Sequence, residues 1–164
     1  YYIQSASDNG VPSQIVPIAR KINEDLPKIY AERIMDEIGR GKSLRILILG
    51  FSYKPELGDC RMTPVLPLAR ELMGKSNEVL IWDPHVERHD FPEDITTVDD
   101  PMSVKGIDAV IIATAHQACV NLDWGALREN CSSAFLFDGR RAMNPEIMGA
   151  FGWKYTGVGY PVDS

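Results

Sequence analysis

The residues with the clearest chemical potential lie in one loop, where a lysine and an arginine stand between a predicted strand and a predicted helix. The loop reads GFSYKPELGDCRMTP over residues 50–64, and its two cations are Lys54 and Arg61. The apolar run at 44–49 that precedes it has the length and branched composition of a strand buried on both faces. A strand-to-helix loop with this content is a candidate anion site.

The physical basis for anion binding is the start of the following helix. Thr63 can cap a helix whose first residue is Pro64, where the missing N–H costs nothing. The unpaired N–H groups of such a terminus carry partial positive charge, so a phosphate or diphosphate is the natural ligand. The alternative is that the two cations are solvated loop charges, because the loop contains neither G-x-G-x-x-G nor G-x-x-x-x-G-K-[ST].

Composition limits the possible partners. The 164 residues are 45% apolar and carry a net charge of −6. This charge argues against a nucleic-acid surface, which would be basic and clustered. No apolar stretch approaches the roughly 20 residues of a membrane span, so we expect no membrane partner. Any anion site must therefore be a local basic spot in an acidic protein. The length of the chain allows one domain of ordinary size with an appendage.

Cysteine and histidine usage predicts no metal site. Cys60, Cys119 and Cys131 form no C-x-x-C pair, which excludes a zinc knuckle and favours a reducing cytoplasm. His85 and His89 stand four residues apart and could bind a metal on a helix. The adjacent proline and polar residues favour a surface loop instead.

The first part of the chain predicts one long amphipathic helix over residues 13–39, ended by Gly39 and Gly41. Pro27 lies in its interior and should kink it. Its apolar stripe, which needs either the following domain or a second copy of the chain as a partner, consists of Ile15, Ile18, Ile22, Leu26 and Ile29.

From residue 44 onward, apolar strands alternate with helical stretches. The predicted strands are 44–49, 78–82, 107–113, 134–137 and a weak one at 153–156; the predicted helices are 64–74, a short one near 100–104, 123–130 and 144–151. This alternation predicts an α/β fold, with a parallel sheet and helices on both faces. Such sheets bind ligands beyond the carboxyl ends of their strands.

Several polar residues follow those strand ends, and each has two interpretations. Asp83 either holds a ribose or forms an Asp-Pro turn. His116 is either a catalytic base or a loop residue, and no Ser-His-Asp or Cys-His set surrounds it. Arg140 and Arg141 follow the fourth strand, as a surface turn or as ligand-binding cations on the same side as Lys54.

These residues resemble a known family. Residues 50–64 resemble the G-x-x-[YF]-K-P-x-x-x-D-x-R-x-[ST]-P signature of nucleotide-sugar 6-dehydrogenases, the UDP-glucose/GDP-mannose dehydrogenase family. The resemblance covers about 44–160, and its further landmarks, in the same order, are Trp82-Asp83-Pro84, Thr114-Ala115-His116, Phe137-Asp138-Gly139-Arg140 and Gly157-Val158-Gly159. An unrelated flavodoxin-like domain is the generic alternative.

The upstream segment resembles the family too. Residues 19–27 are similar to the A-R-x-[IV]-N-[DE]-x-[ML]-P stretch of the central helix that forms the family's dimer interface. Tyr1-Tyr2 resembles the D-P-Y-Y segment after the catalytic cysteine of the UDP-N-acetylhexosamine branch. The resemblance implies that 1–42 is a remnant of the central dimerisation domain and that 43–164 is a Rossmann-like UDP-binding domain. It also implies a homodimer through helix 13–39.

The implied reaction is the NAD-dependent oxidation of the C6 alcohol of a UDP-sugar to a uronate. The substrate would be a UDP-N-acetylhexosamine, with UDP-glucose or GDP-mannose as alternatives, in cytoplasmic synthesis of uronic acids and polysaccharides. The catalytic cysteine and the NAD domain would lie before Tyr1, and no cysteine here matches the nucleophile. We therefore expect no catalytic residue in this chain and no turnover by it alone. A free-standing, non-catalytic nucleotide-binding or regulatory module is the other possibility.

The resemblance also assigns site residues. Tyr53 and Lys54 would contact the diphospho-sugar, and Arg140 would reach the nucleotide. Arg61 would project across the domain cleft toward the NAD cofactor. Arg141 stands where many members have asparagine, so the sequence leaves open which of the paired arginines faces the ligand.

Overall fold

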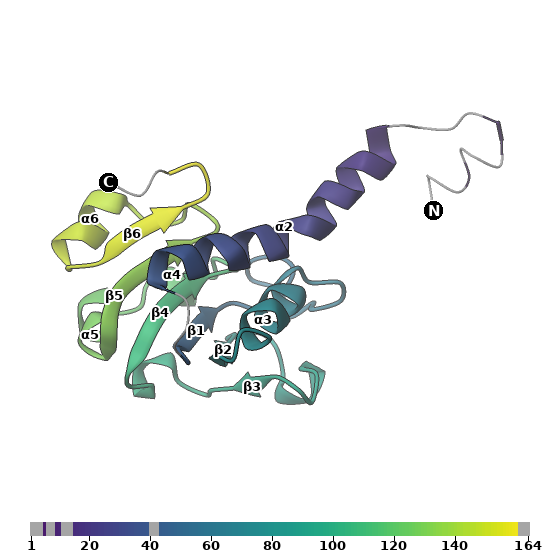
Figure 1. The fold of residues 1–164 in the computed structure, drawn as a ribbon. Helices are drawn as coiled ribbons and strands as arrows, with labels where there is room; N and C mark the ends of the chain where they lie inside the picture. The colour runs from purple at the N-terminus through teal and green to yellow at the C-terminus, as the bar shows by residue number, and fades with distance from the viewer. Residues whose placement is uncertain (1–4, 6–8, 11–14, 40–42, 161–164) are drawn as a thin grey trace.

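The structure, a computed structural model, describes Ser5, residues 9–10, 15–39 and 43–160. It contains a six-stranded parallel sheet with helices on both faces (Figure 1). The strands are β1 (Arg45–Leu49), β2 (Glu78–Trp82), β3 (Thr96–Thr97), β4 (Ile107–Ile112), β5 (Cys131–Asp138) and β6 (Lys154–Gly157). The helices are α2 (Ile15–Ile38), α3 (Val65–Met73), α4 (Gln117–Val120), α5 (Trp124–Glu129) and α6 (Pro145–Ala150), with 3₁₀ turns η1 (Arg88–Asp90) and η2 (Pro101–Ser103).

The strand order is β3-β2-β1-β4-β5-β6, which is the order of a doubly wound Rossmann-like sheet. From β1, successive strands are added first toward β3 and then, from β4, toward the opposite edge of the sheet. The carboxyl ends of β1 and β4 therefore flank the crevice where such folds bind ligands. The predicted α/β fold with a preceding long helix is confirmed. The helix near 100–104 is a 3₁₀ turn, and the strand predicted at 134–137 begins earlier, at Cys131.

Alternate residues of the central strands build two separate cores. Ile46 and Ile48 of β1 pack toward α2 and α3, whereas Leu47 and Leu49 pack on the opposite face with α5 and α6. All four side chains are fully buried. The continuous apolar run at 44–49 therefore reflects burial on both faces, as its composition predicted.

Helix α2 is divided between the core and the surface. Its last two turns bury Ala31, Ile34 and Met35 against the sheet and α3. Its first turns extend away from the domain, and the helix changes direction along its length (Figure 1), as the interior Pro27 predicts. Of the predicted helix 13–39, residues 13 and 14 lie outside the described residues, as do Gly41 and Tyr1-Tyr2.

Within the described part of the chain, no helix is both long enough and apolar enough to cross a membrane.

Gly50, at the end of β1, provides a test of how closely β1 and β4 approach. Its φ is +86°, and a Cβ there would lie 2.4 Å from the carbonyl oxygen of Thr114. Gly152 has a similar φ of +82°, but a Cβ there would meet no atom within 4 Å, so Gly152→Ala introduces the backbone strain alone. We expect Gly152→Ala to cost about 1–2 kcal/mol. Gly50→Ala should cost about 1–3 kcal/mol more, measured by urea unfolding. Equal losses of stability in the two variants would contradict the close approach of Gly50 to Thr114.

Candidate functional site

The site is built on Asp83, the residue directly after β2. Its Oδ2 accepts hydrogen bonds from the backbone N–H groups of Phe51 (2.7 Å) and Ser52 (2.8 Å), at the start of the loop after β1. Its Oδ1 accepts from the N–H groups of His85 (2.8 Å) and Val86 (3.2 Å) in its own turn. The buried carboxylate thus joins two loops, and the geometry supports the Asp-Pro turn over a ribose contact.

These hydrogen bonds determine the charge of Asp83. Burial alone would raise the pKa of its carboxyl, but the hydrogen bonds from His116 and from the backbone N–H groups outweigh burial. The pKa of Asp83 therefore lies well below its usual range, and the carboxylate stays ionised at neutral pH.

His116, after β4, is fully buried beside Asp83. Its Nδ1 accepts from the backbone N–H of Glu56 at 3.0 Å, so the ring proton is assigned to Nε2. Nε2 lies 3.0 Å from Asp83 Oδ2 and 2.9 Å from Ser52 Oγ. Both ring nitrogens are engaged, which supports the loop interpretation of His116 over a catalytic base.

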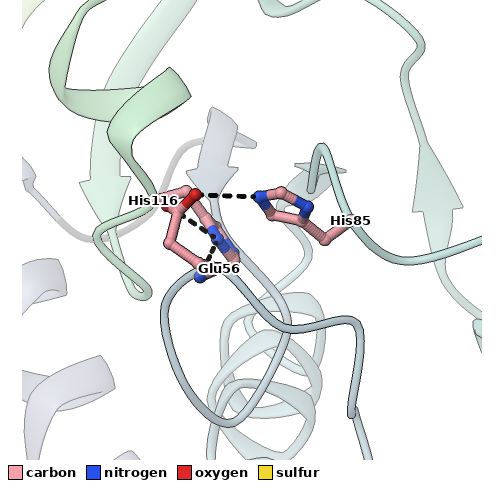
Figure 2. Close-up of side chains that lie close together, drawn as sticks. All are labelled: Glu56, His85 and His116. Atoms are coloured by element: carbon pink, nitrogen blue, oxygen red, sulfur yellow. Dashed lines mark hydrogen bonds and ion pairs between the residues drawn. The ribbon is translucent and has the colours of Figure 1, made fainter.

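Glu56, His85 and His116 lie together at the outer rim of this network (Figure 2), with one ligand atom of each within 4.8 Å of the others. Glu56 Oε2 is 3.4 Å from His85 Nε2. The residue types suit a transition metal, but the single lone pair of His116 Nδ1 is committed to the Glu56 N–H. A metal ion would find only two available ligands, so we assign none. His89, paired with His85 in the sequence analysis, instead lies beside Asp90.

Lys54 and Tyr53 lie at the exposed tip of the loop after β1. The Tyr53 N–H donates to the Asp59 carbonyl at 2.8 Å and closes the loop, while 52% of the Tyr53 residue surface remains exposed. Among the described residues, none is in contact with Lys54 Nζ through a hydrogen bond or ion pair. Both side chains are therefore presented to solvent above the β1 end.

The two consecutive arginines diverge. Arg140 Nε donates to the carbonyl of Ala113, directly after β4, at 2.6 Å, which directs its side chain toward the β1–β4 crevice. Arg141 instead donates to the Val158 carbonyl at 3.3 Å and lies 5.2 Å over the ring of Tyr160, on the β6 side. The structure thus shows that Arg140 and Arg141 point to different strands, which the sequence left open.

Arg61 lies apart from that crevice network. Its guanidinium makes two hydrogen bonds to the Asp59 carboxylate, at 2.9 and 2.8 Å, and its side chain is 87% exposed. The hydrogen bonds from Arg61 lower the pKa of Asp59 to about 2.

Helix α3 begins at Val65, one residue later than the predicted start at Pro64. Thr63 Oγ1 accepts a hydrogen bond from the N–H of Val65, the first residue of this helix, at 3.2 Å.

Sequence reasoning missed the structural role of Asp138, which is the last residue of β5, a position similar to that of Asp83 directly after β2. Asp138 accepts from the N–H groups of Arg140 (2.9 Å) and Met143 (2.9 Å) and from Tyr155 OH (3.0 Å), and so orders the arginine turn. The available signal was the repeated aspartate at a strand end, in Trp82-Asp83-Pro84 and Phe137-Asp138-Gly139. No sequence pattern indicated that Glu56 would contact His116 and Gln117.

The three cysteines are free thiols. Burial raises the pKa of Cys119 to about 12 and that of Cys131 to about 11. It also raises the pKa of Cys60. A nucleophilic cysteine needs a lowered pKa, so none of the three has the environment of one.

Comparison with known proteins agrees with this arrangement. The model of the UDP-glucose/GDP-mannose dehydrogenase family, UDP binding domain, matches residues 47–145, which include the end of β1, the Lys54 loop and the arginine turn. This chain belongs to the UDP-glucose/GDP-mannose dehydrogenase family. The structure resembles a UDP-glucose dehydrogenase from Pyrobaculum islandicum, with a TM-score of 0.78 and 24% identity over 98% of this chain and 35% of that one.

Curated relatives in the family include enzymes for different sugars. UDP-glucose 6-dehydrogenase 4 of Arabidopsis thaliana is 26% identical over 87% of this chain and 35% of its own length. UDP-N-acetyl-D-mannosamine dehydrogenase of Pyrococcus horikoshii is 27% identical over 88% of this chain and 33% of its own length. The chain thus spans about a third of the length of the curated relatives that it matches.

The ionised Asp83 predicts a specific acid sensitivity. Because its pKa is lower in the folded than in the unfolded state, its stabilisation is complete above the ordinary aspartate pKa near 4 and is lost as pH falls through the folded value. Asp83→Asn should destabilise the protein at pH 7, since each charged hydrogen bond lost is worth about 1.5–3 kcal/mol. The deficit relative to wild type should narrow below pH 4. Urea unfolding between pH 3 and 7 tests this, with the exposed Asp99→Asn as control. A pH-independent deficit would contradict it.

Proposed function

We propose that this chain supplies the UDP-binding part of an NAD-dependent UDP-sugar 6-dehydrogenase. The observation that carries the proposal is the position of Lys54 and Arg140 at the β1–β4 crevice of a UDP-binding family domain. Lys54 would contact the diphosphate as a point charge, with Tyr53 beside it, and Arg140 would reach the nucleotide. Arg141 is committed to the β6 side, which favours Arg140 as the ligand-facing arginine.

The organisation follows the same proposal. Residues 1–42 would belong to a dimerisation domain and 43–164 to the UDP-binding domain. The whole enzyme would oxidise the C6 alcohol of its substrate to a uronate in the cytoplasm, for polysaccharide synthesis. The three free cysteines support a reducing compartment. Of the candidate substrates, we propose a UDP-N-acetylhexosamine, because Tyr1-Tyr2 resembles the corresponding segment of the UDP-N-acetylhexosamine dehydrogenases.

NAD is the hydride acceptor that the family implies. The loop after β1 lacks the glycine fingerprint of a dinucleotide site, so this chain does not fit as the main NAD holder. Arg61 is exposed and, among the residues that the structure describes, is held by Asp59 alone. It fits a more limited role, in which its guanidinium contacts the cofactor from across a cleft.

Calorimetry with UDP tests the binding site. Lys54→Ala and Arg140→Ala should each weaken UDP binding about ten- to a hundredfold, because each removes a charge-assisted contact worth roughly 1.5–3 kcal/mol. Arg88→Ala, in a polar loop, and Arg141→Ala, beside Arg140, are matched controls that should change the affinity little. Equal affinity in all variants would contradict the site, and a loss confined to Arg141→Ala would reassign the arginine.

We also propose that the chain forms a homodimer through helix α2. The first half of α2 exposes Ile15 (80%), Ile18 (61%) and Ile22 (55%), more contiguous apolar surface than a monomer usually tolerates. Light scattering should give a dimer mass at tens of micromolar. Ile18→Glu with Ile22→Glu should shift it to a monomer, while Asn23→Glu adds a charge at a polar position as control. A folded wild-type monomer would contradict the dimer.

A further inference from the structure

The loop that carries Lys54 is held by a residue far away in the sequence. His116 contacts it at two points, one on each side of the lysine. On the N-terminal side, His116 Nε2 lies 2.9 Å from Ser52 Oγ, and that hydroxyl donates to the carbonyl of Lys54 itself at 3.1 Å. On the C-terminal side, His116 Nδ1 accepts the N–H of Glu56 at 3.0 Å.

The second contact supports an unfavourable backbone conformation. Glu56 has a φ of 60°, in the left-handed region that residues other than glycine rarely adopt. Its backbone N–H is held by His116, its Oε1 accepts from the Gln117 N–H at 2.6 Å, and its Oε2 lies 3.4 Å from His85 Nε2 (Figure 2). A strained residue persists only where its surroundings over-determine it, and these three contacts do so.

The acceptor is itself fixed in place. Because Asp83 accepts from His116 Nε2 at 3.0 Å, the ring proton stays on that nitrogen and the lone pair of Nδ1 points at Glu56. Asp83 also accepts hydrogen bonds from the N–H groups of Phe51 and Ser52. One buried carboxylate therefore orients both the start of the loop and the His116 ring that holds Glu56.

We propose that His116 is a positioning residue for nucleotide binding: its Nδ1 holds the backbone of Glu56, a contact called here the Glu56 clasp, and thereby presents Lys54 to the ligand in a preformed conformation. This inference rests on the proposed UDP site. Without the clasp, Glu56 would leave its left-handed conformation in part of the population. The apparent affinity for a diphosphate would then fall by the fraction of loops that remain competent to bind.

Two substitutions separate the contacts of the ring. In His116→Asn, the side-chain oxygen falls near the position of Nδ1 and can still accept from Glu56. In His116→Gln, the amide nitrogen falls near Nε2 and can still donate to Asp83, but no acceptor faces Glu56. Loss of one hydrogen bond predicts about tenfold weaker UDP binding for His116→Gln. His116→Asn should bind UDP within about threefold of wild type, even where its resistance to urea falls as far as that of His116→Gln.

The matched control is His89→Gln, which makes the same substitution at an exposed histidine and should leave UDP affinity unchanged. A purely structural role for His116 would make affinity follow stability in both variants, and that result would overturn the proposal. Equal UDP affinity in wild type, His116→Gln and His116→Asn would also overturn it.

Amide hydrogen exchange at Glu56, followed by NMR, tests the clasp without any ligand. The amide should be protected in wild type and His116→Asn and exchange at least tenfold faster in His116→Gln. Failure of the wild-type protein to bind UDP would refute the proposed function. The exchange rates would still test whether His116 holds the Glu56 amide. An unprotected Glu56 amide in the wild-type protein would overturn the clasp whatever the calorimetry gives.

Discussion

The arrangement of the site depends on one buried carboxylate. Asp83 accepts hydrogen bonds from backbone N–H groups of the loop after β1 and of its own turn, and it also accepts a hydrogen bond from His116 Nε2. A buried ionised group is tolerated only when its lone pairs are satisfied, and here backbone amides that would otherwise be unpaired satisfy them. The conformation of the Lys54 loop, the tautomer of His116 and the packing of two strand ends all follow from this constraint.

The same solution recurs at the end of β5. Asp138 accepts from two backbone amides of the following turn and from the hydroxyl of Tyr155. Burial and the adjacent carboxylate raise the pKa of Tyr155, which keeps that hydroxyl protonated as a donor. Because both aspartates accept hydrogen bonds from groups close to them, neither forms an ion pair with Lys54 or Arg140 among the described residues. A local anion site in a protein of net charge −6 is consistent with this arrangement.

The two ends of helix α2 differ in their surroundings. Its C-terminal turns belong to the same core as β1 and α3, and Lys75 Nζ of the α3–β2 connection lies 2.8 Å from Glu32 Oε1. Its N-terminal turns extend away from the domain (Figure 1), and the described residues do not cover their apolar side chains. The predicted stripe thus lies on the uncovered part of the helix, with Leu26 half-buried and its isoleucines exposed, whereas Ala31, Ile34 and Met35 reach the core.

The sequence by itself determined the parallel α/β fold, because strands buried on both faces need continuous apolar runs and the helices between them need a regular periodicity. It also predicted that the Lys54 loop and the arginine pair follow strand ends, and the structure confirms this position. It missed β3 and α4, which span only two and four residues and are too short to show a period. Only the tertiary structure decided the direction of Arg140, the engagement of both nitrogens of His116 and the left-handed Glu56. Each of these depends on contacts between residues more than twenty-five positions apart, which local spacing does not encode.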